Sequence, residues 1–565
     1  MEILLSSFLP EDFSEEYSSD TTRDGSACIT RIRTSRGWRT LDSPYDPYKD
    51  ARRAAGPPDP ASADMLLLGA GSGFYVSHLL QRPINDMLII TASRALAEKN
   101  IAVLETAQRN EGRCTVIVTA RLNEKLLSAI SEFMCSHVDA RIICHAGEMK
   151  AFPELFNPIA LHAFSRAHPF AHRPRKTIKR VLFAYSGRDL IEPEIHSEME
   201  RRGLDVITAG SYRGKNISPA DAWKILGRTK PDLVFSQNNN GSDRNGFLPG
   251  ACQCAGIPCA TWFFDDPRFI VFPEETGDRR SRFCFCWDST GIDACNELGF
   301  ENKALLPIGT DPSIFFPGAG DPSLQGRIVF VGNPSLGNEK TYFSCIANDR
   351  NAVSVAESAE KEIQTSRRLP TRKNICEIMD KLQIAHNCFP ETVLSRLPAF
   401  ALYRANLHYR VAALRALADL HPVVYGDGWE GLLPETVELR GPVDYHGKLA
   451  SIYQSDAVHV SLTHLQMRTY PNQRIFDIGA CGRMVIGDRL EGWHDLFGSA
   501  HDDVLFRNFG QLHDMAGCFA NNPRKRHAIG AGLYAAISEH HTIEKRVDSL
   551  LETVTMNNAS EAVIP

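Results

Sequence analysis

Short runs of apolar residues recur along the whole chain and alternate with stretches of helical periodicity. In the first third of the sequence, such runs cover Met65–Leu68, Met87–Ile90 and Arg141–Cys144. Continuous apolar runs of about four to eight residues are typical of strands that are buried on both faces of a parallel sheet. Their alternation with helices predicts stacked α/β units with right-handed crossovers.

The same alternation continues through the middle and the last part of the chain. The expected strands there are residues 181–185, 232–236, 260–264 and 304–306, followed by 327–331, 422–425, 457–462 and 483–486. Residues 340–419 interrupt the alternation with a helical, charged pattern that contains no strand signal. We therefore expect a helical insertion after the first strand of the last part.

Two segments have the composition of linkers. Prolines and basic residues break the apolar pattern in Ala167–Lys179, and Asp311–Gly326 is rich in proline and glycine. A chain of 565 residues has room for three or four domains of about 150 residues each. The linkers predict an accessory domain over residues 1–170, a second α/β domain over residues 178–318 and a third over residues 327–555.

Composition and charge narrow the class of protein. Hydrophobic residues make up 43% and charged residues 23%, as is usual for folded globular chains. The net charge of −6 offers no general attraction to nucleic acid or to an anionic membrane, so no nucleic-acid partner is expected and a bound anion must meet a local cationic site. No apolar window approaches about 18 residues, and the N-terminus lacks a basic region, which predicts neither a membrane span nor export.

The fifteen cysteines favour a reducing compartment. They include no C-x-x-C pair, and most stand in apolar surroundings such as Ile142–Cys144 and Phe283–Cys286. A thiol in such surroundings behaves as a small hydrophobic group. We therefore expect reduced cysteines and a cytoplasmic protein rather than a zinc knuckle or a redox dithiol.

Candidate ligand-binding residues follow the expected strands of the last part. In open α/β sheets, ligands bind beyond the C-terminal ends of the strands, where glycine lets the backbone approach closely. Each glycine loop here is also compatible with an ordinary turn. The candidates are Gly332 and Asn333 after the first strand, Gly426, Asp427 and Gly428 after the second, and His464 after the third.

The segment TYPNQRIFDIGACGRMVIGD, residues 469–488, carries the densest group of candidates. Its turn at Tyr470 and Asn472 is expected to cap a short helix that ends at a glycine. Arg474 and Asp477 are three residues apart and share one face of that helix. They form either an exposed ion pair or a site in which Arg474 binds a diphosphate and Asp477 a ribose diol.

At these residues the chain resembles the glycosyltransferases of the GT-B fold that are similar to the spore-maturation protein CgeB. Further motifs of that family appear in order as KPDLV, WFFDDP and LPIGTD between residues 230 and 311, and the likeness spans residues 178–551. The resemblance implies two Rossmann-like domains that face each other across a cleft, with the acceptor on residues 178–318 and a nucleotide-sugar donor on residues 327–555. It makes the ligand candidates above donor-binding residues.

The match to the retaining members of that fold is incomplete. They carry an E-x7-E pattern that includes a ribose-binding glutamate, and Asp477 stands in the place of that residue. Thr469 stands where the first glutamate would be. Inversion and retention at the sugar therefore both remain open.

The first 170 residues resemble the N-terminal region of motility-associated-factor flagellin glycosyltransferases. The likeness rests on LDSPYDP at residues 41–47 and on the glycine-rich LGAGSGFY at residues 68–75. A glycine-rich turn after a strand also suits a methyltransferase or a dinucleotide site, but those folds keep an acidic residue after the second strand, where this chain has Thr91. We expect a Rossmann-like domain that packs against its neighbours or recruits a partner, with no redox cofactor.

Asp265 and Asp266 follow an expected strand at the cleft. Adjacent carboxylates can hold Mg²⁺ or Mn²⁺, whereas Asp266 could equally cap a helix that begins at Pro267. We predict Asp265 as the general base that takes the proton of the acceptor hydroxyl, with His196 as the alternative. The GT-B resemblance implies that no metal is needed, because helix N-termini and cations such as Arg474 stabilise the leaving diphosphate.

The sequence thus predicts an α/β protein with two Rossmann-like domains of GT-B type facing a cleft and a further Rossmann-like domain before them. Its expected function is that of a cytoplasmic glycosyltransferase, which moves a sugar from a nucleotide-sugar to a protein, glycan or other cell-surface acceptor. Two alternatives stay open: a non-catalytic sugar-nucleotide-binding or scaffold protein, and a methyltransferase that acts through residues 1–170.

Overall fold

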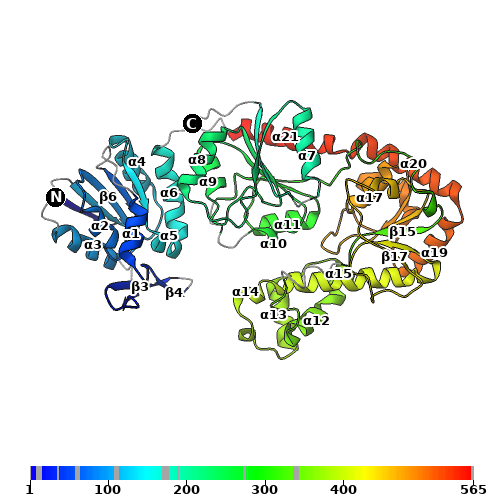
Figure 1. The fold of residues 1–565 in the computed structure, drawn as a ribbon, viewed down its shortest axis with the longest axis horizontal. Helices are drawn as coiled ribbons and strands as arrows, with labels where there is room; N and C mark the ends of the chain where they lie inside the picture. The colour runs from blue at the N-terminus through cyan, green and yellow to red at the C-terminus, as the bar shows by residue number, and fades with distance from the viewer. Residues whose placement is uncertain are drawn as a thin grey trace.

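The computed structural model describes residues 2–7, 16–34, 37–56, 64–106, 113–167, 177–187, 190–271, 275, 278–334 and 343–561. Three α/β domains lie in a row, each built on its own parallel sheet, and a group of helices lies beside the last two (Figure 1). The predicted α/β class with Rossmann-like sheets is therefore confirmed. Across the described part of the chain, no helix has the length and apolar character that a membrane crossing requires.

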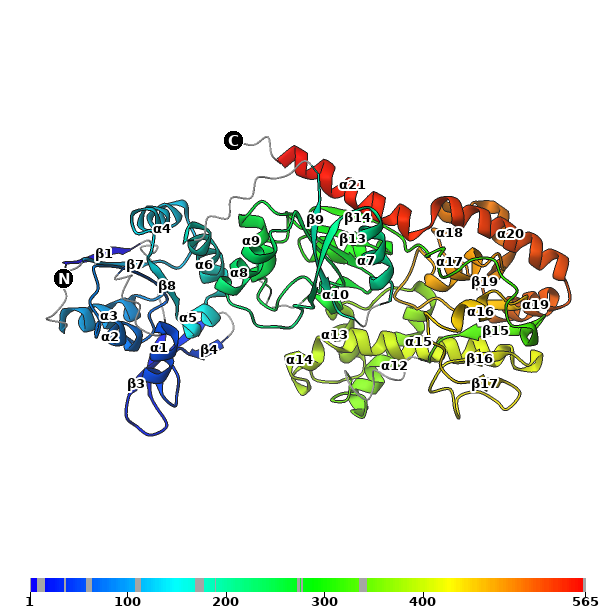
Figure 2. The ribbon, with the colours of Figure 1, turned by 45° about the horizontal axis from the view of Figure 1, so that its top comes forward.

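The first domain has a five-stranded parallel sheet in the order β1-β7-β6-β5-β8, in which the sequence predicted β5, β6 and β8. Its strands are β1 (Glu2–Ser7), β5 (Met65–Leu68), β6 (Asp86–Thr91), β7 (Arg113–Val118) and β8 (Arg141–Cys144). Its helices are α1 (Pro47–Ala55), α2 (Phe74–Leu79), α3 (Arg94–Thr106), α4 (Glu124–Ser136), α5 (Ala146–Ala151) and α6 (Pro153–Ala167). A separate antiparallel sheet projects from this domain and consists of β2 (Tyr17–Thr21), β3 (Cys28–Thr34) and β4 (Gly37–Thr40) (Figure 2).

The middle domain has a six-stranded parallel sheet in the order β10-β9-β11-β12-β13-β14, in which β10 and β13 were not predicted. Its strands are β9 (Arg180–Tyr185), β10 (Asp205–Gly210), β11 (Leu233–Gln237), β12 (Cys259–Phe263), β13 (Phe283–Cys286) and β14 (Lys303–Leu305). Its helices are α7 (Glu192–Arg201), α8 (Pro219–Thr229), α9 (Phe247–Cys254), α10 (Pro267–Ile270) and α11 (Ser289–Glu297).

The last domain has a six-stranded parallel sheet in the order β17-β16-β15-β18-β19-β20, which is the strand order of a Rossmann sheet. Its strands are β15 (Ile328–Val331), β16 (Val423–Tyr425), β17 (Glu438–Arg440), β18 (Val458–Ser461), β19 (Val485–Asp488) and β20 (Leu505–Phe506). Its helices are α16 (Leu449–Tyr453), α17 (Gln473–Ala480), α18 (Trp493–Phe497), α19 (Phe509–Ala520) and α20 (Pro523–His540). The predicted strands are all present, and the edge strands β17 and β20 are additional.

Between β15 and β16 the chain forms the expected helical insertion, called here the helical segment, over residues 343–416. It contains α12 (Arg350–Ser366), α13 (Arg372–Lys381), α14 (Glu391–Leu394) and α15 (Leu397–Ala416). Helices α12 and α15 pack along each other, and Phe269 of the middle domain contacts their apolar core. The helical segment therefore touches both of the domains that follow the first one.

Two neighbouring chain crossings join the middle and last domains. Thr310 and Thr542 form a parallel bridge where the chain passes between the domains in each direction. After the second crossing, α21 (Ile543–Glu561) returns to pack against α7 of the middle domain (Figure 1).

The first and middle domains share an apolar core. Leu161 and Phe164 of α6 are buried in one cluster with Trp223 of α8 and Leu248 of α9. The helices approach so closely that a Cβ at Gly250 would lie 2.4 Å from Cδ1 of Leu161. The first domain is therefore fixed to the middle domain by close packing.

Candidate functional site

Each of the three parallel sheets has a switch point, where the chain order along the sheet reverses. These points lie between β5 and β8 in the first domain, between β9 and β11 in the middle domain and between β15 and β18 in the last. In open α/β sheets, a crevice at the C-terminal strand ends forms there and is the usual ligand site. The side chains in the three crevices therefore decide where the chain can bind a ligand.

The crevice of the first domain is occupied by the chain itself. The carboxylate of Glu148, which is fully buried, accepts hydrogen bonds from the backbone N–H groups of Ala70 at 2.5 Å and Gly71 at 3.0 Å. Asp42 accepts a further hydrogen bond from the Ser72 hydroxyl at 2.5 Å. The glycine-rich turn thus already binds internal carboxylates, which a methyltransferase or dinucleotide cofactor would have to displace.

The crevice of the middle domain is closed in the same way. Glu192 is fully buried and accepts hydrogen bonds from the N–H groups of Ser186 and Gly187, each at 3.0 Å. The side-chain amide of Asn240 donates to the same carboxylate at 3.3 Å. A buried glutamate from the following helix therefore satisfies the loop that leaves β9.

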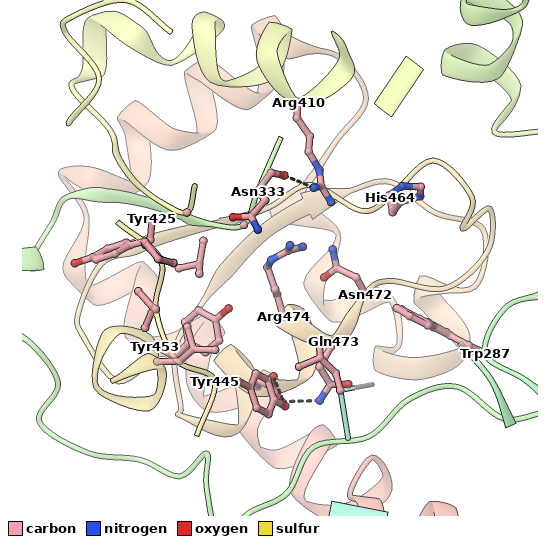
Figure 3. A pocket seen from close by; sticks show the side chains of 18 residues that line it. Trp287, Asn333, Arg410, Tyr425, Tyr445, Tyr453, His464, Asn472, Gln473 and Arg474 are labelled. Atoms are coloured by element: carbon pink, nitrogen blue, oxygen red, sulfur yellow. Dashed lines mark hydrogen bonds between the residues drawn. The ribbon is translucent and has the colours of Figure 1, made fainter. Parts of the chain in front are cut away.

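The crevice of the last domain is open. A pocket of about 420 Å³ lies beyond β15 and β18, and Trp287 of the middle domain forms part of its wall (Figure 3). The pocket brings together seven of the predicted donor-binding residues: Gly332, Asn333, Gly426, His464, Asn472, Arg474 and Asp477. Asp427, Gly428 and Tyr470, which the sequence also predicted for this site, do not line it.

The loop of Asp427 and the turn of Tyr470 have other contacts. The backbone N–H of Asp427 donates to Oδ1 of Asn333 at 2.9 Å. The loop after β16 therefore contacts Asn333, which lines the pocket, without lining the pocket at Asp427. The Tyr470 hydroxyl donates to Asp495 at 3.4 Å, and its N–H donates to Asp288 of the middle domain at 2.8 Å. Tyr470 is therefore part of the contact between the domains.

Arg474 stands in the middle of the pocket (Figure 3). It points toward Gly332, where a Cβ would lie 2.6 Å from the guanidinium, so glycine is needed at that position. No hydrogen bond or ion pair from another described residue holds this guanidinium, whose Cζ lies 5.5 Å from the ring centre of Phe330. Burial lowers the pKa of Arg474 from its usual value. A desolvated cation without a protein partner, placed at a switch point, is suited to bind an anion.

A second guanidinium comes from the helical segment. Arg410 of α15 donates from Nη1 to the backbone carbonyl of Asn333 at 2.5 Å. Burial, together with the positive charge of Arg474, lowers the pKa of Arg410 to about 9. Arg410 therefore remains charged at neutral pH, and the pocket holds two cations close together.

His464 stays neutral beside these cations. Burial and then the charge of Arg410 hold the pKa of His464 well below its usual value. Its Nδ1 accepts a hydrogen bond from the Gln466 N–H at 3.2 Å, which leaves the ring proton on Nε2. His464 can therefore donate a hydrogen bond to a ligand without adding charge.

Asp477 is held by three hydrogen bonds inside the pocket wall. It accepts from the Thr310 hydroxyl at 2.8 Å, from Nε2 of Gln473 at 2.7 Å and from the Tyr445 hydroxyl at 3.2 Å. Burial raises the pKa of Asp477 to about 8, so most of it is protonated at neutral pH. Among the described residues it forms no ion pair with Arg474, and the exposed ion pair considered as the alternative is absent.

Aromatic rings form much of the remaining wall, from Trp287, Tyr425, Tyr445 and Tyr453. The indole N–H of Trp287 donates to the carbonyl of Pro471 at 3.0 Å, which fixes this ring of the middle domain over the last domain. The sequence pattern did not indicate these four rings or Arg410. Only Tyr425 carried a usable signal, since it directly precedes a glycine loop that was predicted.

Asp265 and Asp266 lie in a small cleft that shares Trp287 with the pocket. Asp266 caps α10 by accepting from the Arg268 N–H at 3.0 Å, which confirms the helix-cap interpretation, and it pairs with the Arg268 guanidinium at 2.7 Å. Asp265 accepts from Nε2 of Gln466 in the last domain at 3.2 Å. Over the residues that the structure describes, no cluster of three or more metal-ligating side chains is present.

His196, the alternative base, lies elsewhere. It is on α7, where its Nε2 is 2.9 Å from the Thr208 hydroxyl of β10 and its ring packs edge-on against Phe183. It lines neither the pocket nor the small cleft beside it.

Comparison with known proteins defines the class of the last domain. The family model of glycosyl transferase-like proteins matches residues 408–552, from the C-terminal half of α15 into α21. The matched residues include Arg410, His464, Arg474 and Asp477 of the pocket. This part of the chain is therefore similar to glycosyl transferase-like proteins.

Solved structures resemble the chain at low overall similarity. One is the T4 phage BGT in complex with its UDP-glucose substrate, with 9% identity and a TM-score of 0.39 over 67% of this chain and 99% of that chain. Another is a glycosyltransferase from Rickettsia africae, with 10% identity and a TM-score of 0.37 over 67% of this chain and 98% of that chain. No curated protein matches the sequence. The resemblances to the CgeB-like family and to the motility-associated factors stay predictions.

Proposed function

We propose that the protein is a glycosyltransferase whose last domain binds a nucleotide-sugar donor and whose middle domain receives the acceptor. The observation that carries this proposal is the position of Arg474. Of the three switch-point crevices formed by described residues, the chain fills two with its own glutamates, and Arg474 enters the third. The family match of residues 408–552 supports the same class.

The charge of the pocket fits a nucleoside diphosphate. Arg410 and Arg474 are positive, His464 is neutral, and Asp477 is mostly protonated at neutral pH. The described residues that line the pocket therefore carry about two positive charges, and the diphosphate of a nucleotide-sugar carries about two negative charges. Guanidinium groups match phosphate oxygens with paired N–H donors, which favours a diphosphate over a neutral ligand.

The same groups serve the transfer step. As the bond between the anomeric carbon and the diphosphate breaks, negative charge grows on the leaving oxygens. Arg410, Arg474 and the Nε2–H of His464 would stabilise that charge, and the N-terminal end of α17 adds its partial positive charge. In this proposal the reaction needs no divalent cation.

Further roles follow from the places of the other residues. Asp477 and Tyr445 would bind the ribose, and the loop at Gly426 with Tyr425 would contact the base. Asp265, at the end of β12 in the cleft that shares a wall with the pocket, would take the proton of the acceptor hydroxyl. The acceptor is proposed to be a protein, glycan or other cell-surface molecule, and the protein to act in the cytoplasm.

A thermal-shift screen followed by a turnover assay tests the proposal. The full chain is melted with UDP-, GDP-, ADP- and dTDP-sugars, and a donor that binds the native state should raise the melting temperature. The stabilising sugar nucleotide is then incubated with the protein, and slow release of the nucleoside diphosphate is measured. Release by the wild-type protein that disappears in Arg474→Met is the expected result.

The other outcomes separate the alternatives. Binding without any release of nucleoside diphosphate would indicate a sugar-nucleotide-binding protein. Stabilisation by S-adenosylmethionine, with none by nucleotide-sugars, would favour a methyltransferase. Glu148 argues against that outcome, because its carboxylate occupies the glycine-rich turn of the first domain.

A further inference from the structure

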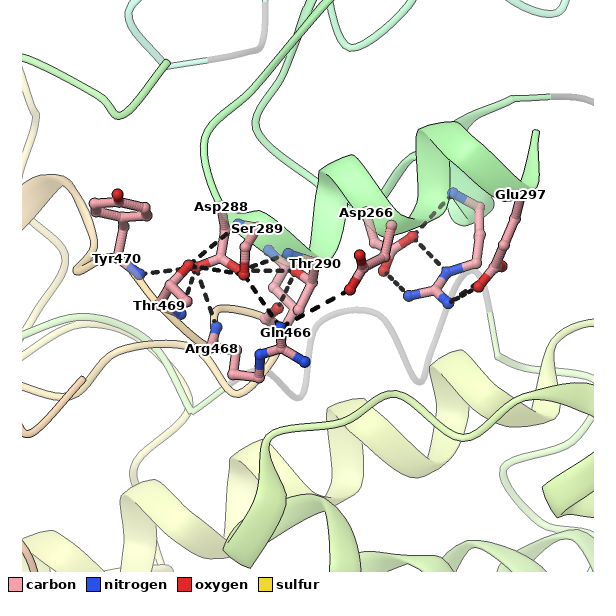
Figure 4. Close-up of polar contacts among 11 residues, drawn as sticks. Asp266, Asp288, Ser289, Thr290, Glu297, Gln466, Arg468, Thr469 and Tyr470 are labelled. Carbon is pink, nitrogen blue, oxygen red and sulfur yellow. Dashed lines mark hydrogen bonds and ion pairs between the residues drawn. The ribbon is translucent and has the colours of Figure 1, made fainter. Parts of the chain in front are cut away.

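A carboxylate of the middle domain holds the segment that leads into α17. Asp288 is buried, and its Oδ2 accepts hydrogen bonds from three successive N–H groups of the last domain: those of Arg468 at 3.1 Å, Thr469 at 2.7 Å and Tyr470 at 2.8 Å (Figure 4). The Thr469 hydroxyl donates a fourth bond to the same oxygen at 2.9 Å. One carboxylate oxygen of the middle domain thus binds three successive residues of the last domain.

Neighbouring residues extend this contact. The Thr290 hydroxyl donates to the carbonyl of Gln466 at 3.1 Å, and the N–H of Ser289 donates to the Thr469 hydroxyl at 3.1 Å (Figure 4). Trp287 donates to Pro471, as described above. We call residues 287–290 together with residues 466–471 the interdomain joint.

The interdomain joint is continuous with the donor pocket on both sides. Trp287 belongs to the joint and to the pocket wall. On the other side, the chain runs from Pro471 directly into Asn472, Gln473 and Arg474, all of which line the pocket. Because α17 starts at Gln473, the place of the segment before it sets where the guanidinium of Arg474 stands.

Four donors converge on one acceptor, and this makes the segment dependent on Asp288. The three successive backbone N–H groups of residues 468–470 converge on one point, and buried donors of this kind require a hydrogen-bond acceptor there. A carboxylate supplies charge-assisted hydrogen bonds, which are stronger than those to a neutral oxygen. Among the described residues of the interdomain joint, the Asp288 carboxylate is the group on which the four hydrogen bonds from residues 468–470 converge.

We propose that Asp288 is a positioning residue for sugar transfer. From the middle domain it fixes residues 468–470, and through them it sets the position of Arg474 relative to Trp287. The inference rests on the proposed function, since it takes the donor to bind at Arg474. It predicts that a change at Asp288, which does not line the pocket, alters the affinity for the donor.

Asp288→Asn is the main test, because asparagine keeps the shape of the side chain and still caps α11. Its neutral oxygen should hold the four donors less tightly. We expect faster hydrogen exchange of the amides at 468–470 and at least a tenfold weaker affinity for the nucleoside diphosphate that binds the wild-type protein best. UDP, GDP, ADP and dTDP are titrated separately by calorimetry, well below the melting temperature. Glu297→Gln, on the same helix and with a side chain that is 54% exposed and pairs with Arg268 outside the joint, should leave both unchanged.

Substitutions at Thr469 provide an independent pair of variants. Thr469→Val removes one of the four donors and leaves the carboxylate intact, whereas Thr469→Ser keeps the hydroxyl. Affinity should fall in the valine variant and be restored in the serine variant. This pair decides the question even where Asp288→Asn fails to fold.

Three results would overturn the proposal. Faster exchange at 468–470 with unchanged nucleotide affinity would make the joint a structural contact without influence on the donor site. Unchanged exchange in Asp288→Asn would mean that the carboxylate does not hold the segment. Equal affinities in the valine and serine variants of Thr469 would count against it in the same way. A wild-type protein that binds none of the four nucleotides would instead refute the proposed function, and this is seen before any substitution is made.

Discussion

Replacing Arg474 by methionine should move ligand affinity and the stability of the free protein in opposite directions. Methionine keeps an unbranched apolar side chain of similar reach but has no charge and no N–H donors. In the structure, no other described residue binds the guanidinium, so its removal breaks no described hydrogen bond. The substitution therefore isolates what Arg474 does for a ligand.

The expected loss of affinity follows from the type of contact. A hydrogen bond to a charged group contributes roughly 1.5–3 kcal/mol, and with about 1.4 kcal/mol for each factor of ten this is a roughly 10- to 150-fold increase in Kd. The free protein should melt at a higher temperature. Burial lowers the pKa of Arg474, and the nearby Arg410 repels it, so the folded state gains when the charge is removed.

Two measurements check this prediction. Calorimetry gives the affinity for the nucleotide that stabilises the wild-type protein, and thermal melts without ligand give the stability. The control is Arg404→Met on α15, since that guanidinium pairs with Glu357 at 3.4 Å outside the pocket. Unchanged affinity in Arg474→Met, or a lower melting temperature of the free protein, would refute the assignment of Arg474 to the donor site.

Four further predictions concern the carboxylates and the metal. The pKa of Asp477 is raised from 3.8 to about 8, so the contribution of its side chain to stability is greatest at low pH and is lost as the pH rises toward 8. The melting temperatures of wild type and Asp477→Asn, measured as the pH rises toward 8, should therefore converge or cross. Melting curves that stay parallel over this pH range would contradict the prediction. Asp265→Asn should lower turnover at least about a hundredfold with unchanged donor affinity. Asp266→Asn should instead lower stability by roughly 1.5–3 kcal/mol through its bond to Arg268, as measured by denaturation. Turnover should persist in excess EDTA, and loss that Mn²⁺ restores would favour a metal site.

Most of the strands that the sequence predicted have both faces buried, although the edge strand β14, which has no fully buried residue, was predicted as well. β5 and β16 are buried at every position, and each is a continuous apolar run. The strands that were missed include β10, which lies at a sheet edge and has no fully buried residue. An edge strand needs little apolar surface, so its sequence resembles that of a loop. β13 is a different case, because its cysteines were interpreted only as buried thiols.

The pocket around Arg474 was predictable where it depends on topology. Ligand loops follow the strands next to a switch point, and this rule indicated Gly332 and His464 from the strand pattern. Arg474 was a candidate because it shares a helix face with Asp477, in a segment that resembles the GT-B glycosyltransferases. Arg410 was not predictable, because it lies in a helix far along the chain from β15 and reaches the pocket only through the packing of the helical segment. The direction of Tyr470 was also hidden, since it depends on Asp288, which is 182 residues away in the sequence.

Because Leu161 and Phe164 are buried against the middle domain, the first domain cannot swing as a tethered module. The first and middle domains therefore form one packed unit whose shared core includes side chains of α6, α8 and α9. A deletion that removed only the first domain would leave Trp223 and Leu248 facing water, and the remainder would be prone to aggregate.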